Sequence, residues 1–261
     1  MGDRKSRIGR AFVALAASAA MGLAAAAATA AEPKIKTLAA GFGYENLTRT
    51  IVWTGDTAST RLKADLFTAR AEFGFAGGIT ASLSAGFVLT SPGGLTFANL
   101  PVSLQYQGPS LRGVTLGAEA VVPIRKFSDF EISGTGRFVY SFGMSKTWPL
   151  EDFAVDGEAE GRSSWAEIAA GPRVSYLFFG RVVPYAEVCL RWLRSGFRMT
   201  ETLEDLGGTE TKRVRGDVSF SVALGADAVV SDRLAVRGKV GILPFAGGVD
   251  SLLSLGILYK F

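Results

Sequence analysis

The residue types with the greatest potential for chemistry are Glu187, Cys189 and Arg191, which are separated by single apolar residues. A thiol between an acid and a base could be an activated nucleophile. The chain contains no histidine, however, so Ser-His pairs, Cys-His pairs and His-based metal sites are excluded. Cys189 is the one cysteine, which also excludes an intrachain disulfide. We therefore expect no catalytic residue, no metal and no cofactor, and we assign these three side chains to packing and ion pairing.

The elements that position such residues are predicted by alternation of apolar and polar residues with a period of two. In residues 79–90 one face is apolar, with Ile79, Ala81, Leu83, Ala85, Phe87 and Leu89. This alternation is typical of β-strands whose two faces meet different surroundings. It recurs in residues 36–53, 61–75, 98–107, 114–122, 130–144, 166–178, 184–192, 214–230, 234–244 and 251–261.

The last strand has the most specific pattern. One face carries Leu253, Leu255, Ile257, Tyr259 and Phe261, and the other carries Leu252, Ser254, Gly256, Leu258 and Lys260. One apolar face and one mostly small or polar face, ending on an aromatic residue, are typical of a transmembrane β-strand. A soluble β-sandwich or lipocalin-like barrel is the structural alternative, in which the same apolar residues would point inward. The terminal Phe261 and a secretory start favour the membrane barrel.

The first 30 residues predict a cleaved signal peptide. A basic start precedes an alanine-rich apolar stretch, and Ala28-Thr29-Ala30 is a small-x-small cleavage site. An uncleaved anchor is the alternative, which the weakly apolar alanines and the cleavage motif disfavour. Removing residues 1–30 takes away four basic residues and Asp3, so the net charge falls from +4 to +1. This near-neutral charge argues against nucleic-acid binding, and we expect residues 31–261 to form one domain.

The strand count leaves two alternatives. The alternating segments number eleven, whereas a single-chain bacterial barrel has an even number of strands. Either residues 36–53 do not cross the membrane, which leaves ten strands, or they hold two short strands, which gives twelve. In residues 61–75 the phase slips at Leu66-Phe67, where we expect a β-bulge. Residues 148–163 and 201–212 are long and polar, and we expect them to be loops outside the cell.

The pattern of residues 31–261 and the terminal Tyr259-Lys260-Phe261 resemble the small bacterial outer-membrane β-barrels, the opacity and adhesin-like barrels among them. The resemblance implies an all-β, antiparallel up-and-down transmembrane barrel in the outer membrane of a Gram-negative bacterium. It also implies outer-membrane lipid, lipopolysaccharide and the barrel assembly machinery as partners, with Tyr259 and Phe261 as the assembly signal. The known enzymes of this class rely on a histidine, which this chain lacks, so we expect no enzymatic activity.

Charges of both signs occupy the polar faces of the predicted strands and would meet in a narrow lumen. They are Arg70, Glu72, Glu119, Glu131, Arg137, Glu167, Arg173, Glu187, Arg191, Arg215, Asp217, Asp227, Arg237, Lys239 and Lys260. Pairing is expected, because an unpaired buried charge costs several kcal/mol. We expect a largely plugged barrel with a structural or interaction role, since barrels near the small end of the range are filled by their own side chains. A narrow pore for small or charged solutes is the alternative.

The predicted loop 148–163 is rich in carboxylates, with Glu151, Asp152, Asp156, Glu158 and Glu160. Such a cluster could bind Ca²⁺ or Mg²⁺ bridged to lipopolysaccharide phosphates. It lacks the fixed ligand spacing of a calcium loop, so we expect a solvated acidic loop. Trp148 could equally mark a partner-binding surface or an aromatic residue at the membrane interface. The sequence does not name an extracellular partner.

Overall fold

The structure, a computed structural model, describes residues 35–53, 59–101, 104–106, 109–150, 156–214, 218–245 and 248–261. The predicted signal peptide, residues 1–30, lies outside the described residues. The described strands are β1 (Ile35–Val52), β2 (Ser59–Phe75), β3 (Thr80–Gly93), β4 (Thr96–Phe97), β5 (Leu104–Gln105), β6 (Leu111–Phe127), β7 (Phe130–Gly143), β8 (Lys146–Pro149), β9 (Gly157–Tyr176), β10 (Val182–Leu203), β11 (Leu206–Arg213), β12 (Val218–Val229), β13 (Leu234–Phe245) and β14 (Gly248–Lys260). A 3-10 turn, Ala76–Gly78, follows β2. No helix within the described ranges is long and apolar enough to cross a membrane.

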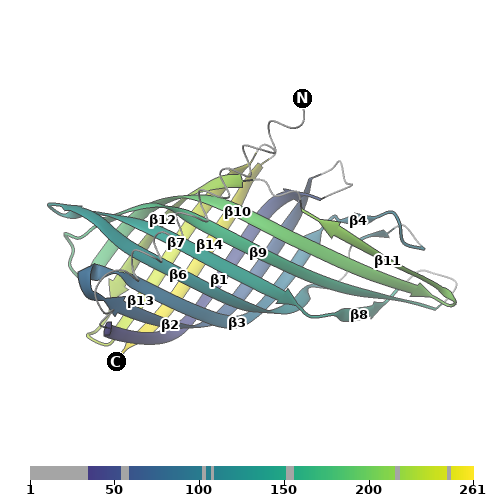
Figure 1. Cartoon of the computed structure of the whole chain (residues 1–261), viewed down its shortest axis with the longest axis horizontal. Coiled ribbons are helices and arrows are strands. Elements are labelled where there is room, and N and C mark those ends of the chain that lie inside the picture. The colour runs from purple at the N-terminus through teal and green to yellow at the C-terminus, as the bar shows by residue number, and fades with distance from the viewer. Residues whose placement is uncertain are drawn as a thin grey trace.

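Ten of the described strands close into an antiparallel barrel (Figure 1). Their order is β1-β2-β3-β6-β7-β9-β10-β12-β13-β14, and β14 pairs with β1 to complete the ring. Closure satisfies the backbone N–H and C=O groups of the first and last strands, which a sheet in a bilayer requires. The predicted all-β, antiparallel up-and-down barrel is confirmed.

The structure has ten barrel strands, which is one of the two predicted counts. The segment that does not cross differs from the predicted one. Ten strands form the barrel, yet residues 36–53 do cross it, because β1 pairs with β2 from Ile35 to Val52. The segment that does not cross is residues 98–107, whose described part adds only the two-residue strand β5, paired with β4. Leu100 and Tyr106 alternate with polar residues because both are buried in an apolar cluster. A packed loop can therefore produce the same polarity pattern as a strand.

The two ends of the barrel differ. We call the end with the connections β2–β3, β6–β7, β9–β10 and β12–β13 the turn end, and the opposite end the loop end. Turn-end connections are short, and Ser128-Asp129 alone joins β6 to β7. Phe261 also lies at the turn end, where its N–H donates to the Leu38 carbonyl at 2.9 Å. The loop end carries the longer connection 94–110 between β3 and β6.

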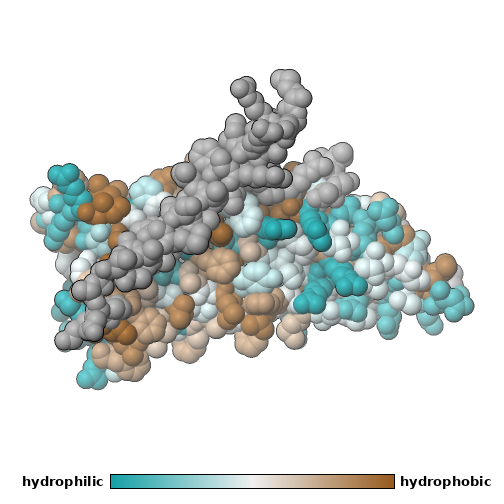
Figure 2. Space-filling model, in the orientation of Figure 1, coloured by the Kyte–Doolittle hydropathy of each residue, from teal (hydrophilic) through white to brown (hydrophobic). Residues whose placement is uncertain are grey.

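The outer face of the barrel carries a broad apolar belt (Figure 2). Along β14, Leu255 and Ile257 are 50% and 44% exposed, whereas Leu252 and Leu258 on the inner face are 2% and 3% exposed. Other large apolar side chains exposed on the outside are Phe42, Phe67, Leu83, Phe87, Leu116, Phe138, Val188, Leu190, Phe220, Leu224 and Val240. A soluble sandwich or lipocalin-like barrel would bury these side chains. Their exposure around a closed barrel fits a lipid-facing surface.

Four strands continue the sheet past the loop end. β9 and β10 pair as far as Leu203 and Gly157, and β8 and β11 flank their outer parts. We call β8 with β11 and the outer parts of β9 and β10 the extension. The prediction of two long loops at 148–163 and 201–212 is therefore wrong for the described residues, most of which are strand. Their polar composition was misleading, because only one face of the extension is covered by apolar side chains.

The interior of the barrel changes character along its axis. Along β2, Arg70 and Glu72 point inward near the turn end, whereas Leu62 and Leu66 point inward near the loop end and are buried. Leu66 therefore faces the interior while Phe67 faces lipid, and the register with β1 and β3 is continuous through both. The predicted β-bulge is wrong. The phase slip at Leu66-Phe67 arises because the side chains on the inner face change from apolar to polar there.

Candidate functional site

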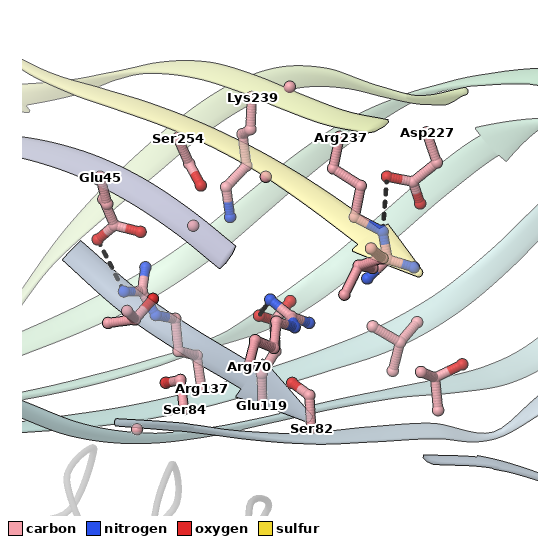
Figure 3. A pocket seen from close by; sticks show the side chains of 18 of the residues that line it. Glu45, Arg70, Ser82, Ser84, Glu119, Arg137, Asp227, Arg237, Lys239 and Ser254 are labelled. Carbon is pink, nitrogen blue, oxygen red and sulfur yellow. Dashed lines mark hydrogen bonds and ion pairs between the residues drawn. The ribbon is translucent and has the colours of Figure 1, made fainter. Parts of the chain in front are cut away.

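Charged side chains surround the lumen toward the turn end (Figure 3). They project inward because each occupies the inner face of its strand, where side chains alternate with a period of two. The basic members are Arg49, Arg70, Arg137, Arg173, Arg191, Arg237 and Lys239. The acidic members are Glu45, Glu72, Glu119, Glu131, Glu167, Glu187 and Asp227. Side chains from opposite walls of the barrel thus meet across the lumen.

A deeply buried ion pair joins β10 to β9. Arg191 Nη1 lies 2.7 Å from Glu167 Oε1, and the two side chains are 1% and 2% exposed. Arg191 Nε also donates to Ser221 Oγ at 2.9 Å, and Arg49 Nη1 lies 3.7 Å from the second carboxylate oxygen of Glu167. Because removing one member of a buried pair leaves an uncompensated charge, this cluster links β1, β9, β10 and β12 firmly.

A chain of ion pairs crosses the lumen on the turn-end side of this cluster. Glu187 is 2.8 Å from Arg173 Nη2 and 3.4 Å from Lys239 Nζ. Arg173 also lies 3.8 Å from Glu119, which pairs with Arg70 at 3.1 Å on the other side. The charges therefore alternate in sign from β13 and β10 across to β2.

A second group lies closer to the turn end. Arg237 Nη2 donates to Glu72 Oε1 at 3.0 Å, its Nη1 contacts the other oxygen of the same carboxylate, and its Nε lies 3.3 Å from Asp227. Two-pronged contact between a guanidinium and a carboxylate fixes both orientation and position. On the opposite wall Arg137 Nη2 donates to Glu45 at 2.7 Å. Most of these charges are held by partners within the protein.

A cavity of about 280 Å³ remains between these ion pairs. It reaches the turn end, where Gly78 and Leu177 line it. Along β10 the order is Tyr185 in the cavity wall, then Arg191, then Leu193 in the apolar cluster, and Arg191 does not line the cavity. The Arg191–Glu167 pair therefore lies between the cavity and the loop end.

The loop-end half of the interior is filled mainly by apolar side chains. Trp165 Nε1 on β9 donates to Thr90 Oγ1 on β3 at 3.2 Å. Further out, the ring of Phe197 packs 5.3 Å from Phe97 and 5.2 Å from Tyr106, centre to centre, in the connection 94–110. We call the following residues the apolar closure: Ile51, Trp53, Leu62, Ala64, Leu66, Val88, Leu95, Phe97, Leu100, Tyr106, Leu111, Val139, Ala159, Trp165, Leu193, Phe197 and Met199.

Most of the charges expected in the lumen are found there. Glu119, Arg137, Glu167, Arg173, Glu187, Arg191, Arg237 and Lys239 all enter the ion-pair network described above. Glu131 lines the cavity, and Ser133 Oγ donates to its carboxylate at 3.3 Å. Arg215 and Asp217 lie outside the described residues. Sequence reasoning missed Glu45 and Arg49, because residues 36–53 had no assigned strand face; their shared parity with Leu47 was the available signal.

Neither candidate for chemistry gains support from its surroundings. Cys189 is buried, and its Sγ donates to Glu187 Oε1 at 3.4 Å, so the thiol packs against an acid already held by Arg173. Within the described ranges, no three Asp, Glu or Cys side chains converge to hold a metal ion. Glu158 and Glu160 are exposed on β9, and Glu151 and Asp152 lie outside the described residues.

A closed antiparallel barrel with a lipid-facing apolar belt and a polar inner wall defines a transmembrane β-barrel of the bacterial outer-membrane class. The fold is similar to that of the outer membrane protease OmpT from Escherichia coli, with a TM-score of 0.54 and 10% identity over 89% of this chain and 99% of that chain. This likeness concerns the fold alone. The sequence matches no family model and no curated protein.

Two other solved barrels align with lower TM-scores. The translocator domain of the autotransporter NalP from Neisseria meningitidis covers 98% of this chain and 98% of its own length, at 10% identity and a TM-score of 0.47. The transport unit of the autotransporter AIDA-I from Escherichia coli covers 89% of this chain and 92% of its own length, at 13% identity and a TM-score of 0.43.

Proposed function

We propose that this chain is a closed outer-membrane barrel that conducts no solute and presents its extension to the outside of the cell. The observation that carries the proposal is the apolar closure across the loop-end half of the interior. A route through the barrel would have to pass Trp165, Leu193 and Phe197, each at most 2% exposed. Ions and polar solutes lose hydration in such surroundings without gaining partners.

The orientation rests on the two ends of the barrel. Barrels of this class keep short turns in the periplasm and longer elements outside. The turn end carries the short connections and Phe261, whereas the loop end carries the extension. We therefore place the charged cavity on the periplasmic side and the extension on the extracellular side.

A narrow pore is the second candidate, because the cavity reaches the turn end. Two features weigh against it. A permeation path needs charges left free to face water and solute, whereas most charges around the cavity are paired with one another. The Arg191–Glu167 pair and the apolar closure also lie between the cavity and the loop end.

An enzymatic role is not favoured. OmpT is a protease by name, but its likeness to this chain concerns the fold. This chain has no histidine to act as a general base. Cys189 is buried beside Glu187 and is not exposed for attack on a substrate. We propose a structural or interaction role for the exposed extension.

Single-channel recording in a planar bilayer tests the closed barrel. We expect no steady conductance from the wild-type protein. Trp165→Ala removes the indole ring that donates a hydrogen bond to Thr90, and this variant should show channel openings. Trp192→Ala on β10, outside the apolar closure, should show no conductance. Steady conductance of the wild-type barrel that changes on neutralising Arg137 or Glu131 would contradict the proposal in favour of the pore.

We also propose that the terminal strand directs assembly. Tyr259 and Phe261 point outward with ring centres 5.3 Å apart, and Phe261 is 77% exposed. Such a pair is available to the machinery that inserts barrels. Phe261→Asp should reduce the heat-modifiable folded form seen on gels, whereas Phe178→Asp in the β9–β10 turn should not. Equal assembly of the wild type and the Phe261 variant would contradict this role for the terminal strand.

A further inference from the structure

An arginine cluster lies on the outer surface of the barrel, just beyond the apolar belt at the loop end. Arg194 and Arg198 on β10, Arg162 on β9 and Arg213 on β11 are all exposed. They point outward, because Leu193, Phe197 and Met199 alternate with the β10 arginines and are buried on the inner face. This cluster is separate from the lumen charges.

The strand register brings these arginines together around a glycine. Arg198 is directly opposite Arg162 across β9 and β10. Gly196, midway between Arg194 and Arg198, is directly opposite Arg213 on β11 and Ser164 on β9. A Cβ added at Gly196 would meet no atom within 4 Å, so open space lies above this position. The arginines therefore border a shallow platform with the half-buried backbone of Gly196 at its centre.

This arrangement is unfavourable without an anion. Like charges directly opposite on neighbouring strands destabilise a sheet, and Arg162 and Arg198 occupy such a pair. Arg162 Nε donates to the Gly143 carbonyl at 2.8 Å, which orients its guanidinium without neutralising it. No described acidic residue pairs with Arg194 or Arg198. The contrast between Arg194 and Arg198 and the lumen arginines, which are paired with carboxylates, points to a partner outside the chain.

The position of the cluster identifies the kind of partner. Along the outer face of β10, Val188 and Leu190 are 46% and 45% exposed, then comes Trp192, then Arg194. Apolar side chains, an aromatic residue and then basic residues are the order expected from the lipid core through the interface to the head groups. Guanidinium groups bind phosphate through paired N–H donors.

We propose that this cluster binds the phosphate group of a lipid in the leaflet at the loop end, with the phosphate above Gly196. Arg162, Arg194, Arg198 and Arg213 would surround it, and the acyl chains would lie along the outward face below Trp192. A phosphomonoester-bearing glycolipid has the required chemistry. The proposal does not depend on whether the lumen conducts, so a conducting barrel would leave it intact.

The test measures lipid retained by the purified protein in detergent, by native mass spectrometry with diphosphoryl lipid A and its dephosphorylated form. We expect retention of the phosphorylated lipid alone. Arg194→Gln combined with Arg198→Gln should weaken it by about tenfold or more. Gly196→Val keeps every charge and has space for its side chain, yet should weaken retention by covering the platform. Lys126→Gln combined with Arg181→Gln, at the turn end, is the control with the same charge change.

Three outcomes would overturn the proposal. Equal retention of the phosphorylated and dephosphorylated lipids would mean that phosphate is not recognised. Equal loss in the cluster and control variants would indicate general charge attraction. Binding of soluble tripolyphosphate without retained lipid would assign the cluster to a soluble anion. The folded form of every variant is checked by heat-modifiable migration, and Gly196→Val provides an independent readout if the double arginine variant fails to fold.

Discussion

The two halves of the barrel interior are filled by different chemistry. The turn-end half holds directional ion pairs around a cavity of about 280 Å³, whereas the loop-end half holds Trp165, Leu193, Phe197 and their apolar neighbours. Both halves are enclosed by strands of one continuous sheet. The difference shows that access to water, rather than position inside a barrel, determines which side chains the wall presents. The half that reaches solvent can hydrate charges, whereas a charge in the sealed half needs partners within the protein, as Asp250, 1% exposed, has in Thr50.

The largest loss in the free energy of unfolding is expected at the boundary between the halves, where a buried ion pair lies next to the apolar closure. Glu167→Gln leaves Arg191, 1% exposed, without its carboxylate. Removing one member of a buried pair costs about 3–5 kcal/mol, and urea unfolding in micelles should show a loss of this size. Glu160→Gln, exposed on the same strand, is the control. Equal small losses in both variants would mean that water reaches Arg191.

Within the apolar half, Phe197→Ala should lower the free energy of unfolding by about 3 kcal/mol, because it leaves a cavity between Phe97 and Tyr106. The same urea experiment measures it. Thr200→Ala on the outward face of β10 serves as the control and should change little. A loss below about 1 kcal/mol in Phe197→Ala would indicate that the connection 94–110 repacks into the space.

The apolar half should also respond to alkaline pH. Burial raises the pKa of Tyr106, in the connection 94–110, to about 12 from its ordinary value near 10. Because the folded pKa is higher, the stabilisation by neutral Tyr106 is complete below pH 10 and is lost as pH rises toward 12. Tyr106→Phe should weaken this pH dependence. Phenolate absorbance during an alkaline titration should show one fewer late-titrating tyrosine in the variant than in the wild type, and an unchanged titration would contradict the assignment.

The smallest loss in the free energy of unfolding is expected in the charged half, beside the cavity. Glu45→Gln removes the partner of Arg137, but both side chains are 13–15% exposed and face the cavity. Water can replace part of the lost interaction, so we expect about 1 kcal/mol in urea unfolding, smaller at high salt. A loss as large as that of Glu167→Gln would mean that the two halves are equally sealed, and the comparison between them would fail.

Part of the candidate site followed from parity along the strands. Glu187 and Arg191 had to share a face, and Glu119 and Arg137 had to point away from lipid, once the apolar faces were assigned. Glu45 and Arg49 were not predicted to point inward, because the two possible strand counts left residues 36–53 without an assigned inner face. The pairing of Arg191 with Glu167 could not be predicted, because partners across a lumen depend on the register and curvature of the whole ring.

The sequence by itself determined the class of fold. Period-two alternation predicts a sheet with two different faces, since side chains on a strand must alternate, and the terminal Tyr259-Lys260-Phe261 favours lipid on one of them. Only the tertiary structure decided what fills the interior. Leu100 and Tyr106 resembled a strand until the closed ring placed them over the loop-end opening, and residues 201–212 resembled a loop until β10 and β11 paired beyond the barrel. These choices depend on contacts between segments distant in sequence, which local polarity does not encode.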